Sequence, residues 1–118
     1  MKIKIDGRLD GLNEYTKACR GNRYGANAMK KRNEKKVIDA LNGWPKIKKF
    51  PVKLKITWYE KNKRRDIDNI TFATKFIQDA LVKAEVLPDD SQKYINAVEH
   101  KVFVDKVNPR VEIEITKN

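Results

Sequence analysis

Residues 52–60 read Val-Lys-Leu-Lys-Ile-Thr-Trp-Tyr-Glu and form the most regular pattern in the chain. Val52, Leu54, Ile56 and Trp58 occupy every second position, with lysine, threonine or tyrosine between them. Alternation of this kind is typical of a β-strand that buries one face. We therefore expect a strand over 52–60 with Trp58 in the core, and we expect the rest of the fold to pack against it.

Weaker patterns on either side predict the remaining elements. Strands are expected at 1–5, 93–104 and 110–116. Helices are expected at 12–19 and 68–84, and a further helix between them ends at about residue 41 without a clear start. Residues 20–26 are predicted to form a basic loop, and the last two strands an antiparallel hairpin around Asn108-Pro109. This order predicts an α+β domain: a small mixed β-sheet with helices packed on one face.

The length of 118 residues is that of one domain, so residues 1–118 are expected to form a single unit. The one cysteine, Cys19, excludes an intrachain disulfide framework and a cysteine-based zinc site, and it favours a reducing, cytoplasmic location. Cys19 itself is expected to be a small packing residue. No apolar run approaches the roughly 20 residues of a membrane span, and the alternating first residues do not form a signal peptide.

The chain is strongly basic, because 27 lysines and arginines against 16 acidic residues give a net charge of +11. A field of this strength concentrates polyanions. Nucleic acid is favoured over an anionic membrane surface, because no basic helix here presents large apolar residues opposite its charges. The basic residues also gather in short runs. In the run 61–65, we expect Lys63, Arg64 and Arg65 to contact phosphates.

Two acidic pairs interrupt this basic sequence, Asp66 with Asp68 and Asp89 with Asp90. Each has an ordinary explanation, since Asp68 suits a helix N-cap and the second pair follows Pro88 in a turn. If the pairs converge, their repulsion requires a cation, and carboxylates alone suit Mg²⁺. Metal-dependent hydrolysis of a phosphodiester needs such ligands within a phosphate-binding surface. The predicted helix between the pairs is about 25 Å long, so convergence requires that the chain returns or that the helix ends early.

Lys75 lies seven residues after Asp68 and four before Asp79. One interpretation is an exposed Lys75–Asp79 ion pair, which contributes about 0.3 kcal/mol. The other is a cation that stabilises the charge that develops on a phosphate during its cleavage. The spacing leaves both interpretations open.

The ordered combination of these motifs resembles the RusA family of Holliday-junction resolvases. The shared pattern is a basic run at Arg64-Arg65, then Asp66-Ile67-Asp68-Asn69, Lys75, Asp79-Ala80-Leu81 and Leu87-Pro88-Asp89-Asp90. This block covers 64–92, and the strands around it also fit, so the resemblance spans most of the chain. It implies a Mg²⁺-dependent endonuclease, with Mn²⁺ as a substitute, that works as a homodimer and nicks opposed strands of a four-way DNA junction.

The same resemblance implies roles for individual residues. The roles are metal ligand and catalytic carboxylate for Asp66, Asp68 and Asp90, catalytic lysine for Lys75, and DNA contact for Arg65. Beyond the resemblance, we consider Asp89 as an auxiliary ligand because it is the neighbour of Asp90. The resemblance also implies that the two acidic pairs meet at one site, within one subunit or across the dimer. One departure is that three extra residues precede the lysine here, which shifts it along a helix by about 4.5 Å.

Two other functions are compatible with the charge and the fold class. One is a non-catalytic basic module that binds nucleic acid, and the other is a related nuclease that acts on forks or flaps. The non-catalytic module leaves the acidic pairs unexplained, because carboxylates repel phosphates unless a metal lies between them. No small-molecule cofactor is expected. A composition rich in lysine, asparagine and isoleucine suggests, together with the family resemblance, a prophage of an AT-rich bacterium.

Overall fold

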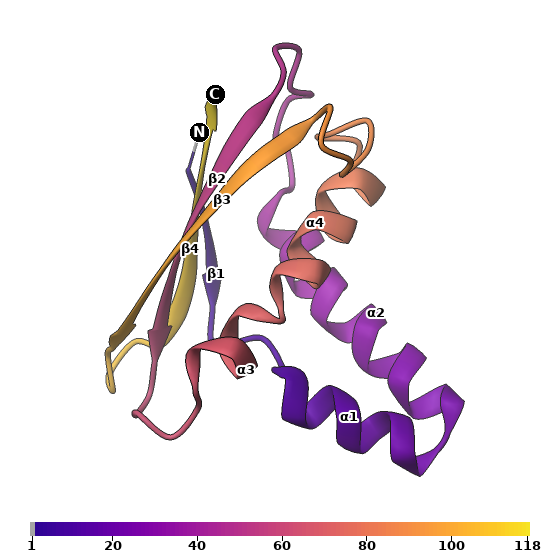
Figure 1. The fold of residues 1–118 in the computed structure, drawn as a ribbon, viewed down its shortest axis with the longest axis vertical. Helices are drawn as coiled ribbons and strands as arrows, with labels where there is room; N and C mark the ends of the chain where they lie inside the picture. Colours follow the sequence, from indigo (N-terminus) through magenta and orange to yellow (C-terminus); the bar gives the residue numbers. More distant parts are fainter. Residues whose placement is uncertain (1) are drawn as a thin grey trace.

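The protein is built on a four-stranded mixed sheet whose helices all lie on one face (Figure 1). The structure, a computed structural model, describes residues 2–118 apart from the side chain of Arg23. The elements in chain order are β1 (Lys2–Asp6), α1 (Leu12–Gly21), α2 (Arg23–Ala40), β2 (Val52–Glu60), α3 (Ile67–Thr71), α4 (Thr74–Lys83), β3 (Ile95–Val104) and β4 (Arg110–Lys117). The predicted α+β class is confirmed, and so is the strand at 52–60.

The order of the strands in the sheet is β1-β4-β2-β3, so β4 lies between β1 and β2. β4 is antiparallel to both neighbours, whereas β2 runs parallel to β3. The parallel pair follows from its connection, because α3 and α4 cross over one face of the sheet between β2 and β3 (Figure 1). The predicted β3–β4 hairpin is therefore wrong, since the turn at 105–109 carries the chain past the end of β2.

Hydrogen bonds on Asp105 fix that turn. Its carboxylate accepts the backbone N–H of Asn108 at 3.0 Å and of Val107 at 3.1 Å, and the Arg110 guanidinium at 2.9 Å. These bonds, led by the one from Asn108 and followed by the one from Arg110, hold the pKa of Asp105 below its ordinary value. The backbone N–H of Asp105 donates to the Glu60 carbonyl at 2.8 Å, which joins the turn to the end of β2.

The core lies between the sheet and the helices. Every second side chain of β2 and of β4 is buried, and Trp58 is only 1% exposed, which confirms its predicted core position. α4 covers this face with Phe76, Ile77, Ala80 and Leu81. Burial of each large apolar side chain contributes about 1.5–3 kcal/mol. The sheet and α4 therefore form the stable base from which the turns at both ends of β2 and β3 project.

Trp58 also contacts the outermost strand of the sheet. Its indole N–H donates to Nδ1 of His100 on β3 at 3.1 Å. Partial burial lowers the pKa of His100 below its ordinary value. Because Nδ1 also serves as an acceptor, the imidazole is neutral at pH 7.

The segment after β2 is two helices instead of the single helix predicted over 68–84. α3 ends at Thr71 and α4 begins at Thr74. The Thr74 hydroxyl donates to the Thr71 carbonyl at 2.6 Å, and a hydroxyl that bonds the preceding turn bends a helix. Lys75 therefore lies on a different helix from Asp68.

The predicted basic loop over 20–26 is also wrong. α1 runs almost directly into α2, and Asn22 is the joint between them. The Asn22 side-chain oxygen accepts the backbone N–H of Gly25 at 2.8 Å, so it caps the start of α2. An asparagine cap of this kind lets one helix follow another without a loop.

Two further expectations concern the surface. Cys19 is exposed on α1, so its predicted packing role is wrong. In residues 2–118, no helix is long and apolar enough to cross a membrane.

Candidate functional site

The first acidic pair lies where the chain leaves β2 and enters α3. Asp66 is the residue before the helix, with an extended backbone, and Asp68 stands in its first turn. Both side chains are exposed. Asp66, not Asp68, holds the N-cap position, and its side chain makes no capping hydrogen bond. Helix capping by Asp68 therefore does not explain the pair.

The second acidic pair follows α4. Asp89 and Asp90 are exposed in the turn before β3, at the opposite end of the α3–α4 segment from Asp66 and Asp68 (Figure 1). In the part of one chain that the structure describes, no three acidic, histidine or cysteine side chains gather closely enough to hold a metal ion. One chain therefore presents the predicted ligands as two separate pairs.

These four carboxylates differ from all the other acidic side chains except Glu114 in having no partner among the described residues. Among the side chains that the structure describes, none of the four takes part in a side-chain hydrogen bond or an ion pair. Every other acidic side chain except Glu114 pairs with a lysine or arginine or, in the case of Asp10, with an amide. In a chain with 27 basic residues, ordinary surface carboxylates find partners easily. The two acidic pairs therefore keep their oxygen atoms available to another cation.

Lys75 on α4 has a partner but remains accessible. Its ammonium lies 3.9 Å from an Asp79 carboxylate oxygen, and the ammonium of Lys30 lies 3.3 Å from the same oxygen. The Lys75 side chain is 62% exposed, and a pair at this exposure is weak. The ordinary Lys75–Asp79 pair therefore exists, and the lysine can still turn towards a phosphate.

The basic run before the first acidic pair has two exposed members and one inward-facing member. Lys63 and Arg64 are exposed, whereas the Arg65 side chain is only 9% exposed. The Arg65 guanidinium donates to both carboxylate oxygens of Glu60, at 2.7 and 2.8 Å, and to the Leu9 carbonyl at 3.1 Å. A bidentate pair of this kind is strong and directional. Arg65 thus has a structural role in the chain, and its predicted contact with DNA stays a prediction.

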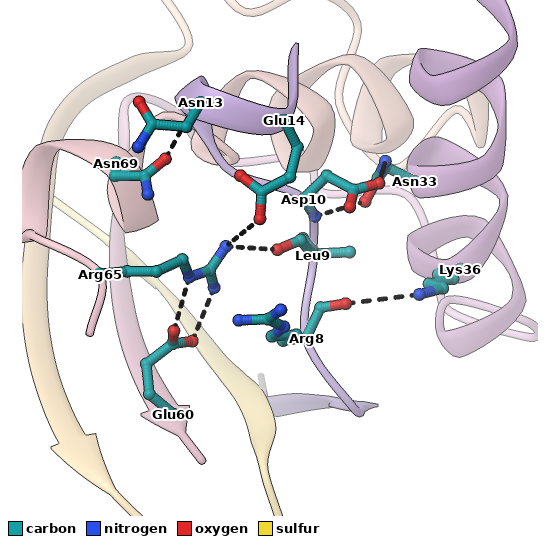
Figure 2. Close-up of polar contacts among 10 residues, drawn as sticks. All are labelled: Arg8, Leu9, Asp10, Asn13, Glu14, Asn33, Lys36, Glu60, Arg65 and Asn69. Atoms are coloured by element: carbon teal, nitrogen blue, oxygen red, sulfur yellow. Dashed lines mark hydrogen bonds and ion pairs between the residues drawn. The ribbon is translucent and has the colours of Figure 1, made fainter. Parts of the chain in front are cut away.

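The Glu60–Arg65 pair fixes the turn that carries the first acidic pair. It joins the last residue of β2 to the residue before Asp66 and so closes the base of the turn (Figure 2). The same guanidinium lies 3.6 Å from Glu14 on α1. On the helix side, Asn69 of α3 accepts the backbone N–H of Asn13 at 2.9 Å. The turn is therefore held from both β2 and α1.

Gly11 is where the start of α1 approaches this network most closely. A Cβ atom at Gly11 would lie 2.5 Å from the backbone oxygen and from the side-chain oxygen of Asn69, and 3.0 Å from the Arg65 guanidinium. We therefore expect Gly11→Ala to lower the free energy of unfolding by about 1–3 kcal/mol, because the backbone must move. Urea denaturation measures the change.

Gly21→Ala is the matched control for this prediction. No atom lies within 4 Å of a Cβ built at Gly21, and alanine favours a helix more than glycine does. Its stability should be unchanged or higher by up to about 1 kcal/mol. If the two variants were equally stable, the close approach at Gly11 would be contradicted.

Glu60 is the functional residue that sequence reasoning missed, although its position in the alternating pattern of β2 indicates that it is buried. It continues the buried alternation of β2, and it is 3% exposed. A carboxylate in phase with buried apolar positions requires a cationic partner. Arg65, five residues later, is that partner. The phase of Glu60 was therefore a signal that one arginine of the basic run would turn inward.

The comparison with protein-family models places these residues in a known group. Residues 13–116 match the family described as endodeoxyribonuclease RusA. The matched range includes both acidic pairs, Lys75 and the basic run. The chain belongs to the RusA family. This confirms the resemblance seen in the sequence, and it makes the molecule a member of a family of DNA endonucleases. A comparison with curated proteins gave no match.

Proposed function

We propose that this RusA-family protein is a Mg²⁺-dependent endonuclease that resolves four-way DNA junctions by paired nicks in opposed strands. The observation that carries the proposal is the set of four unpaired carboxylates in a strongly basic member of an endodeoxyribonuclease family. Unpaired carboxylates on a DNA-binding surface repel phosphates, so they are useful there only with a cation between them and the DNA.

The donor chemistry of the acidic pairs suits Mg²⁺. The ion takes one or two carboxylates and keeps several waters, and it demands oxygen ligands. Asp66, Asp68 and Asp90 would hold it, with Asp89 as an auxiliary ligand. When bound, the ion supplies a Lewis acid that polarises the phosphate and lowers the pKa of water. Mn²⁺ can substitute, because it prefers the same oxygen ligands.

Basic side chains would place the DNA and stabilise its charge. Lys63 and Arg64, exposed beside the first acidic pair, would bind the DNA backbone. Lys75 would direct its ammonium towards the negative charge that develops on the cleaved phosphate. Arg65 would act through its bond to Glu60 as a positioning residue, by holding the turn in which Asp66 lies.

The proposal requires two copies of the chain. One chain holds its acidic pairs at opposite ends of the α3–α4 segment (Figure 1), so one copy would supply Asp66 and Asp68 and another copy Asp90. A four-way junction has two-fold symmetry. A symmetric homodimer would therefore present two identical sites to opposed strands.

Cleavage of a labelled synthetic four-way junction tests this function. With Mg²⁺ we expect paired nicks at symmetric positions that leave 5′-phosphate and 3′-hydroxyl ends, and we expect a linear duplex of the same sequence to stay intact. EDTA should abolish cleavage, and Mn²⁺ should restore it. Binding in EDTA should weaken steeply with salt, because phosphate contacts release counter-ions.

Three outcomes would overturn parts of the proposal. Cleavage that persists in EDTA would show that the reaction does not require a metal ion. A linear duplex cut as fast as the junction would contradict the proposed selectivity for branched DNA. A replication fork or a flap cut faster than the junction would make that structure the substrate.

A further inference from the structure

The contact between α2 and α4 holds a cluster of charged side chains. α2 packs against α4 (Figure 1), and both helices place charged groups in this contact. The cluster consists of Lys30 and Glu34 on α2 and of Lys75, Asp79 and Lys83 on α4. Its ion pairs follow one another so that lysines and carboxylates alternate. Three lysines meet two carboxylates, and the cluster therefore carries one positive charge that it does not balance itself.

Lys83 and Glu34 form the structural end of this cluster. The Glu34 side chain is only 3% exposed, and the Lys83 ammonium donates a 2.7 Å hydrogen bond to its Oε2. A buried carboxylate that loses its cation destabilises the fold strongly. Lys83 is therefore required by Glu34, and its charge is not available to another anion.

Lys30 and Lys75 form the open end of the cluster. Their ammonium groups lie 3.3 and 3.9 Å from the same Asp79 oxygen, both farther than the Lys83 bond. Glu34 Oε1 lies 4.0 Å from the Lys30 ammonium and has no hydrogen-bond partner among the described residues. The two lysine side chains are 38% and 62% exposed, so solvent reaches both. Two accessible ammonium groups thus converge on one place, and each has three N–H donors for the one oxygen that they share.

We infer that Lys30 is a further DNA-binding residue, which holds one backbone phosphate together with Lys75. The inference rests on the proposed function for its ligand, but the paired ammonium groups come from the α2–α4 contact itself. A phosphate has several oxygen atoms, so it accepts hydrogen bonds from both lysines at once and balances the surplus charge of the cluster. Asp79 positions the two lysines, because its charge keeps their like charges together before DNA arrives.

This site gives the DNA a path across the helices. Lys75 lies at the start of α4, seven residues after Asp68 on α3, whereas Lys30 lies on α2. A phosphate between the two lysines leads the backbone from the first acidic pair towards α2. Lys30 opens the basic run 30–32, and in the sequence nothing distinguishes it from the other two members. Its contact with Asp79 on α4 is what separates it from them.

Binding of a synthetic four-way junction in EDTA tests the site without requiring cleavage. We expect Lys30→Met to raise the dissociation constant of the junction about tenfold, because a charge-assisted hydrogen bond to a phosphate is lost. Lys30→Arg keeps the charge and should bind within about twofold of the parent. Fluorescence anisotropy measures both values, and circular dichroism checks that the variants remain folded.

Two lysines of the same helices serve as matched controls. Lys35→Met removes a lysine of α2 whose partner is the exposed Asp39, and it should leave the dissociation constant within about twofold of the parent. Lys83→Met removes the partner of buried Glu34, so it should lower the urea midpoint and leave junction binding unchanged. If Lys30→Met behaved like Lys83→Met, Lys30 would be structural and the inference would be overturned.

The salt dependence of binding tests whether the two lysines share one phosphate. The quantity is the slope of the logarithm of the binding constant against the logarithm of the salt concentration. Lys30→Met combined with Lys75→Met should reduce this slope by about 1, which is the loss of one phosphate contact. A reduction by about 2 would mean two separate phosphates and would overturn the shared site.

Cleavage by the parent separates this inference from the proposed function. If Lys30→Met binds junctions about tenfold more weakly while the parent leaves them uncut, the phosphate site stands and the nuclease is contradicted. If the parent makes paired nicks while Lys30→Met binds junctions as tightly as the parent, the nuclease stands and the phosphate site is overturned.

Discussion

Asp68→Asn should lower the rate of junction cleavage by more than about 100-fold while leaving junction binding intact. The loss follows from the proposed role as a metal ligand, because even residues that merely support a ligand cost 10–100-fold when they are changed. Binding in EDTA should be equal or tighter, since the substitution removes a negative charge that faces phosphates. Single-turnover cleavage and gel-shift titration measure the two quantities separately.

Asp39→Asn is the matched control for this substitution. It makes the same change of charge at an exposed aspartate of α2, where the only partner among the described residues is Lys35. We expect cleavage within about twofold of the parent, because an exposed ion pair of this kind contributes little. If Asp68→Asn cut as fast as Asp39→Asn, the assignment of the carboxylates would be wrong.

Mixing two inactive variants separates a site built by two copies from a site built by one. Asp68→Asn and Asp90→Asn homodimers should both be inactive. If each site takes Asp68 from one copy and Asp90 from the other, a mixed dimer has one site with both native carboxylates and one site with neither. The mixture should then recover single nicks, in place of the paired nicks of the parent. A site within one chain would give no recovery, because each chain would still lack one ligand.

The amino-acid sequence predicted those features that depend on local pattern. The alternation in 52–60 placed β2 and buried Trp58, and the order of the acidic and basic motifs along the chain indicated the family. Alternation describes the faces of a strand, however, and carries no information on its neighbours. That is why the antiparallel hairpin was predicted although β4 lies between β1 and β2.

The hydrogen bonds that individual side chains make were equally hidden from local pattern. The break between α3 and α4 depends on a threonine hydroxyl that bonds the preceding turn, and threonine does not always do so. The buried Asn33 on α2 bonds to Asp10, 23 residues away. Its spacing of four residues from buried Met29 and from Val37 marked it as an inward position. A polar residue in such a phase indicates that a partner exists, but not which residue it is.

Glu60→Ala should lower the free energy of unfolding by about 3–5 kcal/mol, the typical cost of removing one member of a buried ion pair. The Glu60 side chain is 4% exposed, so solvent does not screen the pair, and its loss leaves the Arg65 guanidinium with the Leu9 carbonyl and a more distant Glu14. Replacing both partners, as in Glu60→Leu with Arg65→Met, should cost less, because no unpaired charge remains. Urea unfolding with an unchanged m value measures the difference, and a loss below about 1 kcal/mol for Glu60→Ala would contradict the pair.

Arg64 and Arg65 provide the comparison that separates a structural arginine from a DNA-binding one. Arg65→Met should destabilise the fold, because the Arg65 guanidinium is bonded inside the protein. For the same reason it should leave unchanged the salt dependence of DNA binding, measured as the slope of the logarithm of the binding constant against the logarithm of the salt concentration. Arg64→Met, at an exposed neighbour, should keep the stability and reduce that slope by about 1, the loss of one phosphate contact. If Arg65→Met reduced the slope and kept the stability, the guanidinium would have to leave Glu60 when DNA binds. The turn with Asp66 would then be fixed by the substrate, whereas the present geometry fixes it before the substrate arrives.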